Sequence, residues 1–194
     1  MMNTRSRDLL PYKFKVIRAL LSRADCAKLA RALLASFRAG HFHSGDRGVS
    51  QSYSKYAHPL TEDLLLELLP RMRAETGQVL EPTYSYLRIY TEGAVLKKHR
   101  DREACEFSVT LNLACASEPW PIWIDNGVKS VSIALSPGDG LLYKGCECPH
   151  WREVLQGAWN LQVFLHYIDS KGPFADLRFD GRDTLNLTQR ATLA

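Results

Sequence analysis

From residue 83 onward, short segments rich in β-branched and aromatic residues alternate with turns. This pattern constrains the fold more than any other feature of the sequence. The segments end at Gly or Pro turns, such as Glu92-Gly93 and Asn126-Gly127. Many short strands separated by such turns are typical of a β-sandwich or jelly roll. The segments expected to be strands are 83–90, 106–113, 121–125, 131–135, 140–144 and 159–168.

The residues before this β-rich region have helical periodicity instead. Apolar side chains recur on one face of residues 24–38, which predicts a first helix, and residues 61–76 carry a similar pattern. Pro70 falls inside the second pattern, so we expect a kink or a break there. Residues 40–58 have no clean period and are expected to form a surface loop that can fold over a pocket as a lid. A weak alternation over 12–17 predicts an edge strand.

The length of 194 residues predicts a single domain, 1–194. Within it we expect a helical N-terminal support with the lid loop over 1–80, a β core over 83–168 and a C-terminal appendage over 169–194. Apolar runs fall far short of the roughly 18 residues that cross a membrane. We see no export signal, and the five cysteines are an odd number, which together indicate reduced thiols and a cytoplasmic protein. The net charge of +4 is scattered along the chain, so nucleic-acid binding is not indicated.

A candidate metal site begins at His99-Arg100-Asp101. The first and third side chains alternate to the same edge of a strand or turn, so an imidazole and a carboxylate can reach one ion. His150 lies about fifty residues further on and supplies a second imidazole. Two histidines and one carboxylate form the facial triad that binds non-haem Fe(II) and leaves coordination positions open. The sequence therefore predicts that His99, Asp101 and His150 bind a metal and are catalytic.

The chain also resembles a known family, and the resemblance rests on an ordered set of features: Tyr90, the turn at Gly93, His99-x-Asp101, Pro137-Gly138-Asp139 and His150. With them, residues 83–168 resemble the prolyl-4-hydroxylase-like branch of the Fe(II)/2-oxoglutarate-dependent dioxygenases. The resemblance implies a mainly β, double-stranded β-helix fold (jelly roll, cupin-like) with flanking N-terminal helices. It implies Fe(II) as cofactor, 2-oxoglutarate as co-substrate, and decarboxylation to succinate and CO2 coupled to oxidation of an unactivated C–H bond. Tyr90 matches the family tyrosine that contacts the co-substrate.

The chain departs from the family pattern where the far carboxylate of 2-oxoglutarate is held. The resemblance implies an Arg or Lys about ten residues beyond His150, but residues 158–162 contain no cation. Arg152 is expected to share a strand face with His150, and Arg88 to share one with Tyr90. Either guanidinium suits a carboxylate, and the pattern favours Arg152, then Arg88.

Other side chains are expected around the triad. Gln162 and Asn112 are candidates for neutral hydrogen bonds to the co-substrate. His166 is expected on the interior face of the last strand as a pocket residue, and Arg102 as a contact to a polar substrate. Trp151 is next to a predicted ligand and is expected to shield the metal from water and to contact the substrate.

These features predict a hydroxylase that uses O2 and acts on a small molecule, an amino acid or a peptidyl residue. The resemblance implies hydroxylation and not halogenation, since halogenating relatives replace the Asp101 carboxylate with a small residue. Arg47 and Arg178 are further candidates to meet an anionic group of the substrate. Two alternatives stay open: a metal-binding, cupin-like sensor without turnover, and a nucleic-acid demethylase, which rests only on the pI of about 8.8.

Overall fold

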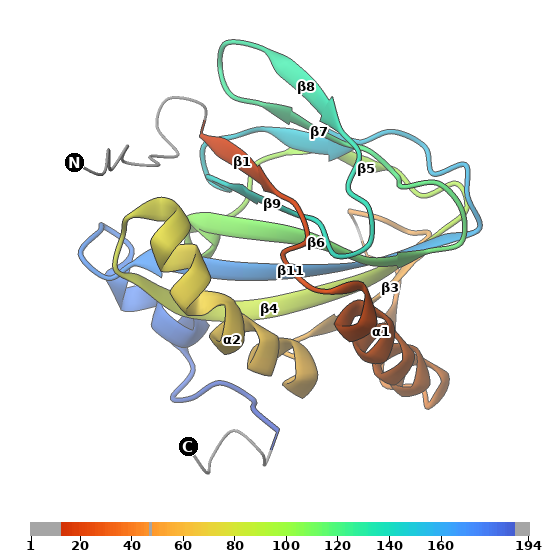
Figure 1. Cartoon of the computed structure of the whole chain (residues 1–194), viewed down its shortest axis with the longest axis horizontal. Helices are drawn as coiled ribbons and strands as arrows, with labels where there is room; N and C mark the ends of the chain where they lie inside the picture. The colour runs from red at the N-terminus through yellow and green to blue at the C-terminus, as the bar shows by residue number, and fades with distance from the viewer. Residues whose placement is uncertain (1–12, 47, 189–194) are drawn as a thin grey trace, which may run out of the picture.

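The computed structural model describes residues 13–46 and 48–188, which form two antiparallel sheets that face each other (Figure 1). The major sheet has the strand order β1-β9-β6-β11-β4-β3-β2 and the minor sheet the order β5-β10-β7-β8. The strands of the major sheet are β1 (Phe14–Ile17), β2 (His43–Ser44), β3 (Ser52–Tyr56), β4 (Leu80–Thr91), β6 (Phe107–Cys115), β9 (Gly140–Tyr143) and β11 (Trp159–Asp169). Those of the minor sheet are β5 (Leu96–His99), β7 (Ile122–Asp125), β8 (Ser130–Ile133) and β10 (His150–Arg152). The predicted jelly-roll architecture with N-terminal helices is confirmed.

Two helices pack against the major sheet: α1 (Arg23–Arg38) and α2 (Pro59–Thr76) (Figure 1). Gly77 ends α2 in the left-handed conformation, with φ of 70°. The expected break at Pro70 is wrong, because α2 continues through it. Pro70 lies on the exposed side of the helix, where water can satisfy the carbonyl group that the missing N–H leaves free.

The stretch expected to be a lid loop is partly regular structure. Residues 43–56 form the β2–β3 hairpin, which pairs with β4 and extends the major sheet. Between the two strands the structure describes residues 45–46 and 48–51, and Asp46 lies near the start of this loop. The predicted edge strand is confirmed as β1, although Tyr12 lies outside the described residues.

The two faces of the major sheet differ in chemistry. The outer face is apolar and packs against α1 and α2 through Leu87, Ile89, Val109, Leu111, Val163 and Leu165. The inner face, which looks toward the minor sheet, is apolar at β9, where Leu141 packs with Ile122 and Ile124 of β7. Over β4, β6 and β11 it is largely polar, and its buried members there include Tyr84, Arg88, Tyr90, Ser108, Thr110, Asn112, Asn160, Gln162 and His166. An apolar core between two sheets is the usual arrangement. A polar interior face has little value for stability, so we infer that it serves to bind a ligand.

The C-terminal segment is tied to α2 by a fully buried carboxylate. Glu62 accepts hydrogen bonds from the guanidinium of Arg182 at 2.9 and 3.3 Å and from the backbone N–H of Asn186 at 2.9 Å. The predicted appendage therefore packs on the domain, and it contains the 3-10 helix Ala175–Gly181. Among the described residues, no helix is long and apolar enough to cross a membrane.

Candidate metal centre

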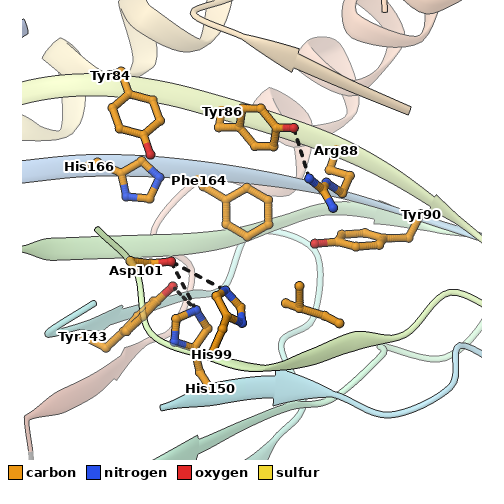
Figure 2. Close-up of a pocket in the computed structure, with 11 residues that line it drawn as sticks. Tyr84, Tyr86, Arg88, Tyr90, His99, Asp101, Tyr143, His150, Phe164 and His166 are labelled. Carbon is orange, nitrogen blue, oxygen red and sulfur yellow. Dashed lines mark hydrogen bonds and ion pairs between the residues drawn. The ribbon is translucent and has the colours of Figure 1, made fainter. Parts of the chain in front are cut away.

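The three predicted metal ligands meet between the two sheets. His99 at the end of β5 pairs directly with His150 at the start of β10, and Asp101 follows β5 by two residues. The Asp101 Oδ1 atom lies 3.6 Å from Nε2 of His99 and 3.6 Å from Nε2 of His150. Figure 2 shows the three side chains pointing toward one another. Three such donor atoms on one side of a common point leave the other side open, as a facial triad requires.

Backbone carbonyl groups select the tautomer of both histidines. Nδ1 of His99 lies 2.8 Å from the carbonyl oxygen of Lys97, and Nδ1 of His150 lies 3.0 Å from that of Cys148. A carbonyl oxygen only accepts, so each Nδ1 must carry the proton and donate it. The lone pair of each imidazole is then on Nε2, which faces Asp101. Burial also lowers the pKa of His150, which favours the neutral form that binds metal.

Asp101 is held by its surroundings. Its backbone N–H donates to the carbonyl oxygen of Gly145 at 3.1 Å, and Ser108 Oγ donates to its Oδ2 at 3.2 Å. A Cβ atom on Gly145 would clash most closely with the carbonyl oxygen of Cys105, and it would lie 2.6 Å from Ser108 Oγ and 2.7 Å from that Oδ2, so only glycine fits here. These contacts turn Oδ1 toward the two histidines.

A cavity of about 180 Å³ opens beside the triad. Its walls come from β4, β9 and β11 of the major sheet and from β5 and β10 of the minor sheet (Figure 2). The lining residues are Tyr84, Tyr86, Arg88, Tyr90, Leu96, His99, Asp101, Tyr143, His150, Phe164 and His166. Tyr90 and His166 therefore lie where the sequence predicts pocket residues.

A second group of possible ligands shares Asp101 and adds Cys105 and His166. Burial raises the pKa of the Cys105 thiol, and the thiolate is the form that binds metal. His166 Nδ1 lies 2.9 Å from Ser108 Oγ, and burial lowers the pKa of His166 to about 4. The group of His99, Asp101 and His150 is the better match to a metal, because both imidazoles direct Nε2 toward Oδ1 of Asp101 while each Nδ1 meets a carbonyl oxygen.

The two candidate arginines occupy different places. Arg152 is 1% exposed, donates from Nη1 to the carbonyl oxygen of Trp120, and does not line the cavity. Burial lowers its pKa to about 10, and within the described part of the chain it has no anionic partner. Arg88 is 8% exposed and lines the cavity, but it already pairs with Asp46.

Several buried polar atoms on the interior face lack a hydrogen-bond partner among the described residues. They are Nε and Nη2 of Arg152, Nε of Arg88, Oδ1 of Asn112 and Nδ2 of Asn160. Each such atom costs about 1–3 kcal/mol when it stays unpaired. A polar, anionic ligand between the sheets would offset this cost, and 2-oxoglutarate is such a ligand.

The structure does not bring every predicted residue to the cavity. Gln162 and Asn112 are buried on the interior face but bond to protein groups, Asn160 and the Leu135 carbonyl respectively. Arg102 lies at the surface and forms two hydrogen bonds with Asp180, at 2.5 and 2.8 Å.

Trp151 lies on the side of β10 opposite the buried His150 and stacks on Trp123, with ring centroids 5.8 Å apart. Arg178 pairs with Glu81 at 3.2 Å, and Arg47 lies outside the described residues.

Sequence reasoning missed several lining residues. Tyr84, Tyr86 and Phe164 form an aromatic wall, and Tyr143 lies 3.3 Å from Nε2 of His150 through its hydroxyl group. The period-two pattern Tyr84-x-Tyr86-x-Arg88-x-Tyr90 was an available signal, because it places all four side chains on one face of β4.

No family model matches the sequence, and no curated protein matches it. Its fold is that of the 2-oxoglutarate- and Fe(II)-dependent oxygenases, so the resemblance seen in the sequence is confirmed at the level of the fold. Solved structures that match include a Pseudomonas putida prolyl-4-hydroxylase, with a TM-score of 0.71 and 15% identity over 84% of this chain and 95% of that one.

A Trichoplax adhaerens prolyl hydroxylase, bound to a peptide fragment of hypoxia inducible factor, matches with a TM-score of 0.70 and 17% identity over 84% and 86% of the two chains. HygX of Streptomyces hygroscopicus, bound to nickel, 2-oxoglutarate and hygromycin B, matches with a TM-score of 0.66 and 14% identity over 82% and 84%.

Proposed function

We propose that this protein is an Fe(II)/2-oxoglutarate-dependent dioxygenase that hydroxylates a small molecule, an amino acid or a peptidyl residue. The observation that carries the proposal is the meeting of two Nε2 atoms and one carboxylate oxygen beside a polar cavity. When bound, Fe(II) and 2-oxoglutarate supply the activation of O2 that oxidises a C–H bond, with release of succinate and CO2. The matching solved structures support this class, since one of them binds 2-oxoglutarate.

His99, Asp101 and His150 would hold the metal. The donor set suits a divalent ion of intermediate softness, and the Nδ1–H bonds to the backbone keep both imidazoles oriented. Ser108 and Gly145 act through Asp101 by fixing its carboxylate.

Arg152 would hold the far carboxylate of 2-oxoglutarate. Its guanidinium is buried, has two unpaired nitrogen atoms and is near enough to Tyr90 and Tyr143 to influence the pKa of both. A buried cation without an anion is costly, and a bidentate carboxylate is its natural partner. Arg152 does not line the cavity, so its side chain would have to move for the far carboxylate to reach it.

The remaining lining residues would exclude water and receive the substrate. Tyr84, Tyr86 and Phe164 present rings to the cavity, and His166 stays neutral because burial lowers its pKa. The matching structures bind a peptide in one case and hygromycin B in another, so both substrate classes remain compatible with the fold. The cytoplasmic location stays a prediction.

Succinate release tests the proposal. The purified protein is incubated with Fe(II) and 2-oxoglutarate under air and under nitrogen, with and without pools of candidate substrates. We expect succinate that requires both Fe(II) and O2 and is absent from His99→Ala. A protein that binds Fe(II) but forms no succinate above background in any condition would instead be a metal-binding sensor.

A further inference from the structure

Among the described residues, two arginines are buried, Arg88 and Arg152, whereas one co-substrate needs a single cation for its far carboxylate. If Arg152 serves 2-oxoglutarate, as proposed above, Arg88 remains as a cation that lines the cavity. An arginine that is 8% exposed is expensive to bury unless its charge is used. We therefore ask which anionic ligand the guanidinium of Arg88 binds.

The bonding of Arg88 is incomplete. Its Nη2 donates to Oδ2 of Asp46 and to the hydroxyl oxygen of Tyr86, the latter at 3.1 Å. Its guanidinium also lies over the rings of Tyr86 and Tyr90, at 5.3 and 5.6 Å from the ring centroids. Its Nε is buried and has no partner among the described residues. The side chain is therefore fixed in place with a donor still available.

Asp46 is an anion that can be exchanged. It lies in the loop between β2 and β3, and its side chain is 39% exposed. Its Oδ1 accepts from the backbone N–H groups of Gly48 and Val49, both at 2.8 Å, so those two bonds hold the loop whether or not Arg88 is present. Asp46 is the exposed member of the pair, so a carboxylate from solution can reach this position. If that carboxylate replaces Asp46, the buried guanidinium keeps an anionic partner, so the exchange has a low cost.

We propose that Arg88 binds an acidic group of the substrate to be oxidised, in the position now taken by the Asp46 carboxylate. This inference rests on the proposed function. Phe164 lies between Arg88 and the triad in Figure 2, and Tyr86 and Leu96 also line the cavity, so the body of the substrate is apolar or aromatic. The cavity of about 180 Å³ limits the part that enters to a small group. The substrate is thus a small carboxylic acid, or a molecule that presents one on a flat, apolar arm.

Matched acid and amide probes test this assignment. The probes are 4-fluorophenylacetate, 3-(4-fluorophenyl)propionate and their two amides, titrated into the protein loaded with Fe(II) and 2-oxoglutarate under nitrogen. Fluorine NMR line broadening reports binding. We expect at least one acid to bind at least tenfold more tightly than its amide, as a charge-assisted hydrogen bond implies. Arg88→Met should abolish the preference, and Arg88→Lys should keep part of it.

Three further samples make the test specific. Asp46→Asn should bind the acid at least threefold more tightly, because the competing anion is gone. Arg18→Met, which removes an exposed arginine that pairs with Asp139, is the matched control and should leave the preference unchanged. The 2-oxoglutarate affinity of Arg88→Met, measured by calorimetry under nitrogen, should stay within twofold of the original.

The inference is overturned if no acid is preferred over its amide, if Arg88→Met keeps the preference, or if Asp46→Asn weakens acid binding. A large loss of 2-oxoglutarate affinity in Arg88→Met with no change in probe binding would also overturn it, while leaving the proposed oxygenase intact. Failure of the original protein to bind 2-oxoglutarate would count against the proposed function, and the probe preference is then measured with Fe(II) alone.

Discussion

The backbone of Gly145 packs directly against the carboxylate of Asp101. A Cβ at position 145 would lie 2.7 Å from Asp101 Oδ2, well inside van der Waals contact. Gly145→Ala should therefore turn the carboxylate away from the two histidines and lower the affinity for Fe(II) by about 10–100-fold, the range for residues that support metal ligands.

An Fe(II) titration under nitrogen measures this effect. Gly157→Ala is the control, since its Cβ would meet the movable hydroxyl group of Ser117. Equal affinities in the two variants would show that Gly145 does not position Asp101.

Substitutions of Arg152 and of Arg88 should differ in how much they change the requirement for 2-oxoglutarate. Arg152→Gln should raise the 2-oxoglutarate concentration needed for half-maximal turnover by well over tenfold, because a hydrogen bond to a charged group is worth about 1.5–3 kcal/mol. Arg88→Gln should change it by less than threefold. The dependence of succinate formation on 2-oxoglutarate concentration gives both values, and the reverse order would assign the far carboxylate to Arg88.

His166 should make folding stability sensitive to acid. Burial lowers its pKa from 6.5 to about 4, so the unfolded chain binds the proton first as the pH falls. Above pH 6.5 the imidazole is neutral in both states, and the free energy of unfolding has its full value. As the pH falls from 6.5 to 4, the free energy of unfolding decreases by up to about 3 kcal/mol.

Urea unfolding of the metal-free protein at a series of pH values tests this, with His166→Asn as the comparison. The variant should lose less stability over the same pH window. If the free energy of unfolding falls equally with pH in the two proteins, His166 is not the cause of the acid sensitivity.

The buried carboxylate of Glu62 should depend on Arg182. Arg182→Ala leaves Glu62 with no cationic partner in the interior, and breaking a buried ion pair in this way costs about 3–5 kcal/mol. The free energy of unfolding in urea measures the loss. Arg178→Ala, which removes a partly exposed pair with Glu81, is the control and should cost much less.

The sequence predicted the parts of this protein that follow local rules. The helix over 24–38 and the strands β4, β6, β9 and β11 have clear periods, and the structure confirms them within a few residues. The strands β5 and β10, which carry both histidines, have only four and three residues, too few for a period to be visible. For them the spacing of metal-binding residue types was the informative signal.

The surroundings of the arginines depend on contacts between distant segments. The pairing of Arg88 with Asp46 joins residues 42 positions apart in the chain, and the burial of Arg152 beside Trp120 joins residues 32 positions apart. Strand parity correctly placed Arg152 on the buried side of β10 with His150, but parity gives no information on how far a long side chain reaches. For that reason the sequence favoured Arg152 over Arg88 but did not predict that Arg152 lies outside the cavity lining.

The metal content of ligand variants tests the central claim most directly. Fe(II) bound per chain is measured under nitrogen after equilibrium dialysis, for the original protein and for His99→Ala, Asp101→Ala and His150→Ala. The control is His43→Ala, which removes an exposed histidine of β2. We expect one Fe(II) per chain in the original protein and in the control, and a loss of affinity of at least a hundredfold in each of the three ligand variants. Undiminished Fe(II) binding in Asp101→Ala, or loss of the metal from His43→Ala, would contradict the assignment of the site.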